Sequence, residues 1–374
     1  MKKIVSLAVV LVMTISLGLV GCGKSDEKNG SQSGDKVASN GLKVVTLING
    51  NLGDKSFFDS AAEGMKIAKE KLGYETKVIE MGFDKTKWEP TLQDVSDEDW
   101  DLIIVGTWEM MEYLERVATQ YPDKKYIIFD TGMDFSKGNL KNIYSIEYKQ
   151  NEASFLAGVL GGKFTTSGME GTNADKKIGF LGAMDSPIIN DFLAGYIQGA
   201  KHVDKDMKVA ISYVGNFEDS AKGKEMSLAQ YNQGVDIGFN VAGQAGLGQL
   251  DAAKELKKYV IGVDSDQYAL FAESDPEKAS LITTSVLKRV DNSLVRALEL
   301  FKDDKLEFGK GEVLGLEEQA VEIAENENYN KLISEELRKE LADIKAKIIS
   351  GEIKVESSIG MDKAGLDALK ESAK

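Results

Sequence analysis

The chain has 374 residues, of which 42% are hydrophobic and 29% charged; this is ordinary for a globular protein and excludes wholesale disorder. Its formal net charge of −15, with no cluster of lysines and arginines, argues against a nucleic-acid polymer as partner. A single cysteine, Cys22, and a single histidine, His202, exclude Cys/His zinc sites, Cys–His nucleophiles and an intrachain disulfide.

The amino-terminal segment predicts export and lipid attachment. Two lysines precede an apolar run over residues 4–20, which is too short and too interrupted for a permanent membrane span. The four residues ending at Cys22 resemble a bacterial lipobox, whose cysteine receives the lipid; the alternative is a buried cysteine after a plain secretory signal. We therefore expect residues 1–21 to be a lipoprotein signal peptide, Cys22 to be lipidated and residues 22–41 to be a flexible tether. This places the folded part on the extracytoplasmic face of a bacterial cell membrane.

From residue 42 onward, short apolar runs alternate with stretches of helical periodicity. The apolar runs are continuous, which is typical of parallel strands buried on both faces. The pattern runs twice, and this predicts an α/β fold with two doubly wound parallel-sheet lobes. Strands are expected at 44–48, 77–81, 101–105, 126–129, 177–181, 208–214, 235–240, 259–263 and 281–286.

The segments that follow the second run are expected to complete both sheets by crossing between the lobes. The first lobe is predicted to hold residues 42–148 and 267–308, and the second lobe residues 149–266 and 309–350. Residues 351–374 are expected to form a C-terminal tail.

Candidate site residues follow the strands, because ligands of open parallel sheets bind beyond the carboxyl ends of the strands. Two adjacent phenylalanines, Phe57 and Phe58, begin the first predicted helix. Exposed aromatic rings at a surface turn do not stabilise a protein in water, so their presence there indicates another role. Aromatic rings favour a flat ligand, and ionised carboxylates accept hydrogen bonds from N–H or hydroxyl groups. The candidate ligand-binding residues are Asp54, Phe57, Phe58, Trp108, Asp130, Phe239, Gly243, Asp264 and Lys288.

Most of these candidates also have an ordinary structural explanation. The segment 53–56 superficially resembles a phosphate loop, but Asp54 stands where glycine is needed and would repel phosphate. The structural explanations are core packing for Phe57, Phe58 and Phe239, a strand-end cap for Asp264, packing between lobes for Trp108 and solvent exposure for Lys288.

Four segments, in this order along the chain, resemble the basic membrane protein (BMP) family, the PnrA-like nucleoside-binding lipoproteins of ABC importers. These segments are residues 53–61, 241–248, 262–267 and 285–291. The resemblance covers roughly residues 43–324 and implies a type I periplasmic-binding-protein fold, whose two lobes close over a purine or pyrimidine nucleoside.

The resemblance also implies roles for individual residues. The base would lie between two rings, the first lobe would offer one carboxylate, and the second lobe would bind the ribose. This chain departs from many relatives at Phe58, where they have asparagine, and at Gln244, where they have a second glycine. The implied roles are base stacking for Phe57 and Phe239, hydrogen bonding for Asp130, and ribose binding for Asp264, assisted by Lys288 and the backbone near Gly243.

We therefore expect a lipid-anchored substrate-binding protein that captures a nucleoside, by preference a purine nucleoside, and delivers it to an ABC permease. We expect a monomer that is not an enzyme and has no cofactor or metal. Three further hypotheses stay open: a binding protein of the same fold for a sugar or signalling molecule, a surface nucleoside hydrolase, and an adhesin without a small ligand. A hydrolase needs a larger carboxylate cluster than Asp264 and Asp266 provide.

Overall fold

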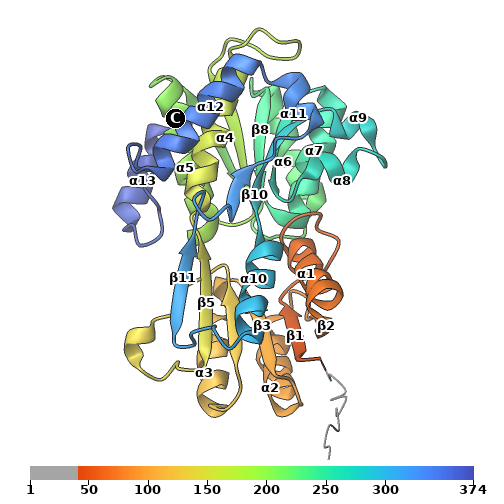
Figure 1. The fold of residues 1–374 in the computed structure, drawn as a ribbon. Coiled ribbons are helices and arrows are strands. Elements are labelled where there is room, and N and C mark those ends of the chain that lie inside the picture. The colour runs from red at the N-terminus through yellow and green to blue at the C-terminus, as the bar shows by residue number, and fades with distance from the viewer. Residues whose placement is uncertain (1–40) are drawn as a thin grey trace, which may run out of the picture. The chain divides into compact units, whose positions relative to one another are not determined.

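Two six-stranded sheets organise residues 41–374, the part of the chain that the computed structural model describes (Figure 1). They confirm the predicted α/β fold with two doubly wound lobes, here called the first and second lobe. The predictions for the signal peptide, for lipidation of Cys22 and for residues 23–40 lie outside the described residues. Within residues 41–374, no helix is long and apolar enough to span a membrane.

The sheet of the first lobe is parallel throughout and has the order β11-β5-β4-β3-β1-β2. Its central strands are runs of buried aliphatic residues, which is why they have helices on both faces. The strands are β1 (Lys43–Ile48), β2 (Glu75–Glu80), β3 (Leu102–Gly106), β4 (Tyr126–Phe129), β5 (Ile143–Tyr148) and β11 (Lys310–Leu314). The helices are α1 (Phe57–Ile67), α2 (Trp88–Asp97), α3 (Met111–Gln120) and α10 (Val290–Lys302).

The sheet of the second lobe has the order β12-β10-β9-β8-β6-β7, and only β12 runs antiparallel to its neighbour. Its strands are β6 (Lys177–Gly182), β7 (Lys208–Tyr213), β8 (Ile237–Val241), β9 (Tyr259–Asp264), β10 (Ile282–Lys288) and β12 (Val321–Ile323). Its helices are α4 (Gln150–Thr165), α5 (Pro187–Val203), α6 (Ser220–Asn232), α7 (Gly243–Leu256), α8 (Gln267–Phe271), α9 (Pro276–Ala279), α11 (Glu327–Leu332), α12 (Glu335–Ile349) and α13 (Lys363–Ser372).

Helices α4 and α5 pack with their backbones in close approach. A Cβ atom at Gly195 would lie 2.0 Å from the carbonyl oxygen of Asn151, and one at Gly199 would lie 2.0 Å from that of Phe155. Glycine is required at both positions because any side chain would push the helices apart. This packing fixes the position of α5, whose first turn reaches the cavity described below.

The chain passes between the lobes at three places: from β5 to α4, from β10 to α10 and from β11 to β12. Backbone hydrogen bonds join these crossings. The Lys149 N–H donates to the Leu314 carbonyl at 2.8 Å, and the Arg289 N–H donates to the Ala320 carbonyl at 2.8 Å. The lobes are therefore connected by three adjacent segments that are hydrogen-bonded to one another.

The lobe boundaries differ from the predicted ones at these crossings. The segment 267–308 is predicted for the first lobe, yet β10 lies beside β9 in the second sheet, and only α10 packs against α1 in the first lobe. Conversely β11, from the segment 309–350, is an edge strand of the first sheet. The predicted tail is also part of the second lobe, since the Ala373 carbonyl accepts the Val209 N–H of β7 at 2.8 Å. Strand periodicity identifies a strand but does not say which of two sheets it joins.

Candidate ligand-binding site

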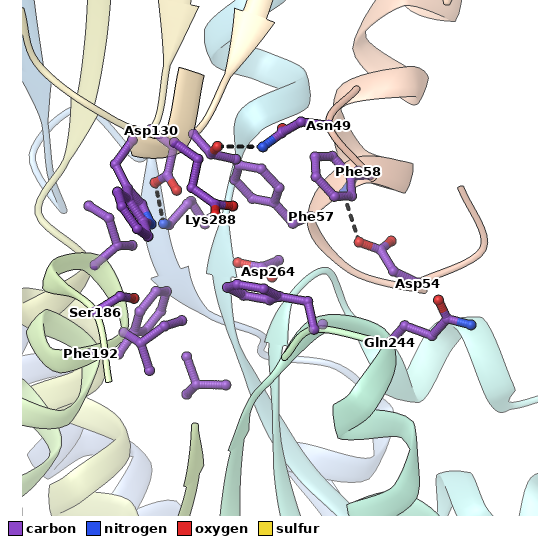
Figure 2. Close-up of a pocket in the computed structure, with 18 of the residues that line it drawn as sticks. Asn49, Asp54, Phe57, Phe58, Asp130, Ser186, Phe192, Gln244, Asp264 and Lys288 are labelled. Atoms are coloured by element: carbon purple, nitrogen blue, oxygen red, sulfur yellow. Dashed lines mark hydrogen bonds and ion pairs between the residues drawn. The ribbon is translucent and has the colours of Figure 1, made fainter. Parts of the chain in front are cut away.

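A cavity lies between the two lobes at the carboxyl ends of their strands (Figure 2). It contains about 790 Å³ of atom-free space, part of it open to solvent. Its lining includes eight of the nine predicted ligand-binding residues. These are Asp54, Phe57, Phe58, Trp108, Asp130, Gly243, Asp264 and Lys288.

The structure corrects the ninth prediction, Phe239. Its side chain is fully buried in the middle of β8, and its ring centroid lies 5.1 Å from that of Tyr196 and 6.2 Å from that of Phe192. The strand continues to Val241, and this later residue lines the cavity instead. Phe239 is therefore a core residue, and the rings that the second lobe brings to the cavity are Phe192 and Phe217.

The two predicted rings of the first lobe lie side by side at the start of α1. The centroid of Phe57 is 5.2 Å from that of Phe58, with the rings nearly perpendicular, and 5.5 Å from that of the core residue Phe129. Phe58 packs over Gly50, where a Cβ atom would lie 2.3 Å from the ring. Phe57 thus combines a core contact with a surface in the cavity, so core packing and ligand contact are compatible for this ring. Phe58 packs on Phe57 and Gly50 and also lines the cavity.

The carboxylate of Asp54 holds the start of α1 in place. It accepts the backbone N–H groups of Ser56, Phe58 and Asp59 at 3.0, 2.9 and 3.2 Å. Burial raises the pKa of Asp54 to about 6, although these hydrogen bonds act in the opposite direction. Both carboxylate oxygens are thus engaged by the backbone of the segment that holds Phe57 and Phe58.

A buried ion pair between Lys288 and Asp130 joins the lobes. The Lys288 Nζ lies 2.5 Å from the Asp130 Oδ1, and the two side chains are 2% and 8% exposed. The ammonium also lies 4.8 Å from the ring centroid of Phe192 and 5.6 Å from that of Phe57. Burial raises the pKa of Asp130, and the adjacent ammonium works against that rise. Lys288 is therefore not a solvated lysine.

A second set of contacts between the lobes surrounds Asp264. Its Oδ2 accepts a short hydrogen bond from the Ser56 hydroxyl of the first lobe. Next to it, the Ser265 hydroxyl donates to the Ser56 carbonyl at 3.1 Å, and the Gln267 amide donates to the Lys55 carbonyl at 3.2 Å. Burial raises the pKa of Asp264 to about 7, while the nearby ammonium and the serine hydroxyl lower it. This carboxyl group can therefore change its charge near neutral pH.

Backbone strain gathers at the strand ends that line the cavity. Thr107, Asp130 and Asp264 follow or end β3, β4 and β9, and have φ angles of 71°, 66° and 60°. Residues other than glycine rarely adopt this left-handed conformation, and such positions cluster at functional sites. Gly243, at the start of α7, has a φ angle of 54°. The strain supports a functional interpretation of these strand ends.

Two buried oxygens in the cavity lining have no hydrogen-bond partner in the described protein. They are the Oδ1 of Asn49, which directly follows β1, and the Oγ of Ser186, which precedes α5. Neither residue was predicted, and neither were Phe192 and Phe217. The strand-end rule would have selected Asn49 directly, and it points to the loops after β6 and β7 that hold Ser186 and Phe217. Phe192 lies within α5 and gives no such signal.

The lining carries more negative than positive charge. Asp54, Glu109, Asp130 and Asp264 contribute carboxyl groups, and among the described lining residues Lys288 is the one cation. Its charge is already paired with Asp130. A phosphate group entering this cavity would meet like charges. Within residues 41–374, no cluster of histidine, cysteine and acidic side chains could hold a metal ion.

Comparison with known proteins identifies the family. The family model described as "ABC transporter substrate-binding protein PnrA-like" matches residues 42–358. The chain belongs to this family. Substrate-binding proteins of ABC transporters act outside the cytoplasm, in association with the membrane, and bind a ligand for a permease.

Individual relatives agree with this family. The chain is 33% identical to "Basic membrane protein A" of Borreliella burgdorferi over 84% of this chain and 88% of that protein. It is 28% identical to "ABC transporter nucleoside-binding protein BmpA" of Lactococcus lactis, over 95% of this chain and 99% of that protein. Its structure matches the crystal structure of an ABC transporter solute-binding protein from Aeropyrum pernix with a TM-score of 0.78 and 26% identity, covering 89% and 98% of the two chains. The predicted type I fold is confirmed.

Proposed function

We propose that this protein captures a nucleoside, by preference a purine nucleoside, between its lobes and delivers it to the permease of an ABC importer. The observation that carries the proposal is that aromatic rings from both lobes share one cavity with buried carboxyl groups from both lobes. A flat base is suited to the rings, and the ribose hydroxyl groups are suited to the carboxylates. The nucleoside-binding relative from Lactococcus lactis supports the same ligand class.

Lobe closure is the proposed mechanism of capture. The pair Lys288–Asp130 and the contact Ser56–Asp264 each join the two lobes beside the cavity. A ligand that contacts both lobes stabilises the closed arrangement by its greater affinity for it. Stacking on one ring contributes about 1–3 kcal/mol, and a hydrogen bond to a charged carboxylate contributes about 1.5–3 kcal/mol. These contributions support micromolar or tighter binding after the cost of ordering is subtracted.

A panel of ligands, measured by isothermal titration calorimetry and by thermal shift, tests the proposal. Inosine, guanosine and adenosine are expected to bind more tightly than hypoxanthine, ribose or inosine monophosphate. The free base lacks the hydroxyl groups proposed to bind the carboxylates, and ribose lacks the flat ring proposed to bind the aromatic side chains. The phosphate meets the carboxylates of the lining. Equal affinity for the monophosphate would refute the electrostatic argument. Binding of a sugar alone would favour a sugar-binding protein, release of free base from inosine would favour the hydrolase, and no response to any ligand would favour the adhesin.

The ring of Phe57 is expected to carry part of the affinity. Phe57→Leu removes the aromatic face and should weaken nucleoside binding by up to about 1–3 kcal/mol, the value of stacking on one ring. Phe239→Leu is the matched control, because it removes an equal ring from the core of β8. The control should lower the melting temperature and leave the affinity of the folded protein unchanged. If Phe57→Leu instead lowers the melting temperature and leaves the nucleoside affinity unchanged, Phe57 is a core residue only.

Lipid attachment at Cys22 is part of the proposal. Cys22→Ser removes the thiol that would carry the lipid, so the protein should be left unprocessed or released from the membrane fraction. Fractionation of cells, with mass spectrometry of the mature amino terminus, provides the measurement. Cleavage at the same bond and unchanged membrane association in the variant would contradict lipidation. Size-exclusion chromatography with light scattering tests the proposed monomer.

A further inference from the structure

Ser186 has the backbone of a helix cap but does not cap its helix. It directly precedes α5 with φ −134° and ψ 160°, the extended conformation of an N-cap residue, and Pro187 follows it. Its hydroxyl nevertheless makes no hydrogen bond to the helix and has no other partner in the described protein. The residue is 4% exposed and lines the cavity, and Figure 2 shows its oxygen pointing into that space.

The first turn of α5 adds further donors at the same place. The first backbone hydrogen bond of the helix runs from the Asn190 N–H to the Ser186 carbonyl at 2.9 Å. The N–H groups of Ile188 and Ile189 therefore lack an acceptor within the helix, and both residues line the cavity. A helix of 17 residues also has partial positive charge at its amino-terminal end. Donors thus predominate at this end of the cavity, in contrast to the carboxylates elsewhere.

We propose that the Ser186 hydroxyl and the amino terminus of α5 bind a hydrogen-bond acceptor of the ligand. This inference rests on the proposed function and assigns the acceptor to the nucleoside, either to the oxo group or a ring nitrogen of the base, or to a ribose oxygen. Ionised carboxylates cannot donate hydrogen bonds, so Asp130 and Asp264 in their ionised forms cannot serve such an atom. A buried hydroxyl without a partner is costly, and a ligand acceptor removes that cost.

The segment that carries Ser186 is held in place before a ligand arrives. The neighbouring Asp185 accepts a hydrogen bond from the Asn190 amide at 2.7 Å and pairs with Lys370 of α13 at 2.8 Å. The Tyr213 hydroxyl of β7 donates to the amide oxygen of Asn190 at 2.6 Å. The close packing of α5 on α4 fixes the helix itself. Such preorganisation lowers the ordering cost of binding, so one hydrogen bond from Ser186 contributes directly to the affinity.

Two serine variants separate ligand binding from helix capping. Ser186→Ala is expected to weaken inosine binding about 3- to 10-fold. The melting temperature of the ligand-free protein should stay the same or rise, since no cap is lost and a buried hydroxyl without a partner is removed. Ser334→Ala is the matched control: Ser334 accepts the Leu337 N–H at 3.2 Å and caps α12, away from the cavity. The control should lower the melting temperature and leave the dissociation constant unchanged.

Ligand analogues identify the acceptor atom. Adenosine replaces the oxo group of inosine with an amino group, 7-deazainosine removes a ring nitrogen, and 2′-, 3′- and 5′-deoxyinosine each remove a ribose oxygen. The analogue that lacks the atom bound by Ser186 should bind the wild type and Ser186→Ala with equal affinity, whereas the others should retain the difference. A wild type that binds no nucleoside would overturn the proposed function and this inference with it. A wild type that binds inosine no better than Ser186→Ala does would overturn this inference alone.

Discussion

Replacing Lys288 by methionine is expected to lower the free energy of unfolding by about 3–5 kcal/mol, the cost of leaving a buried charge without its partner. Methionine keeps roughly the length of the side chain but removes its charge, and with it the ammonium that lies over the rings of Phe57 and Phe192. The carboxylate of Asp130 therefore loses the ammonium 2.5 Å away and stays buried. Unfolding by denaturant measures the effect, with a check that the slope of the free energy of unfolding against denaturant concentration is unchanged.

The destabilisation by Lys288→Met should depend on pH. Burial already raises the pKa of Asp130 above its ordinary value, and removal of the ammonium raises it further. The folded variant then holds a proton that the unfolded chain has released, so its stability falls as pH rises through this range. The loss should therefore be larger at pH 8 than at pH 5. Adding Asp130→Asn to the variant removes the buried charge and should restore part of the stability.

A surface lysine provides the control for this experiment. Lys363 pairs with Asp367 at 2.6 Å, but the two side chains are 85% and 57% exposed. Lys363→Met should therefore change the stability by no more than about 0.5 kcal/mol. If Lys288→Met unfolds at the same denaturant concentration as this control, the ion pair contributes nothing to the folded state.

Nucleoside affinity is expected to fall by at most about 30-fold between pH 8 and pH 5.5, because Asp264 becomes protonated. This bound follows from its pKa of about 7 if the ionised form alone binds the ribose hydroxyls. A ligand that donates to the carboxylate favours ionisation, so binding releases a proton below this pKa. Calorimetry in two buffers of different ionisation enthalpy measures that release directly.

The stability of the ligand-free protein should have the opposite pH dependence: it should fall as pH rises, whereas the nucleoside affinity rises. Asp264 and Asp54 both have raised pKa values, about 7 and about 6, so the folded state retains protons that the unfolded state loses. Their contribution to stability therefore falls as pH rises from about 4 to about 7. Asp264→Asn should bind more weakly than the wild type at pH 8 and lose most of the pH dependence of binding. An unchanged pH dependence in this variant would assign the titration to another group.

The sequence was sufficient to predict two parallel-sheet lobes, although not their boundaries, and half of the first-lobe residues that line the cavity. Continuous buried runs mark parallel strands, and the residues after them, such as Asp130 and Asp264, reach the ligand end of any parallel sheet. Phe57 and Phe58 stood out because a helix start in solvent does not favour two rings. These features depend on local chemistry, which neighbouring residues in the chain are enough to reveal.

The errors arose where a role depends on packing between distant segments. Phe239 is directed into the core by its position in β8, and the one-residue difference between predicted and actual strand end was enough to hide this. Phe192 and Ser186 reach the cavity because α5 is set against α4, a contact that sequence periodicity does not record. Asp54 was recognised as a lining residue, but its engagement by three backbone N–H groups appears only in the folded loop.

The last turn of the chain has a consequence for how the protein can be truncated. The family match ends at residue 358, and a chain cut there would keep both sheets and the cavity lining. It would lose Ala373, whose carbonyl pairs with Val209 on β7, the outermost strand of its sheet. Unpaired strand edges invite pairing with other copies and aggregation. Tags and fusion partners are therefore better inserted within the predicted tether, residues 23–40, than close after Ala373, where they would compete with the segment that shields this edge.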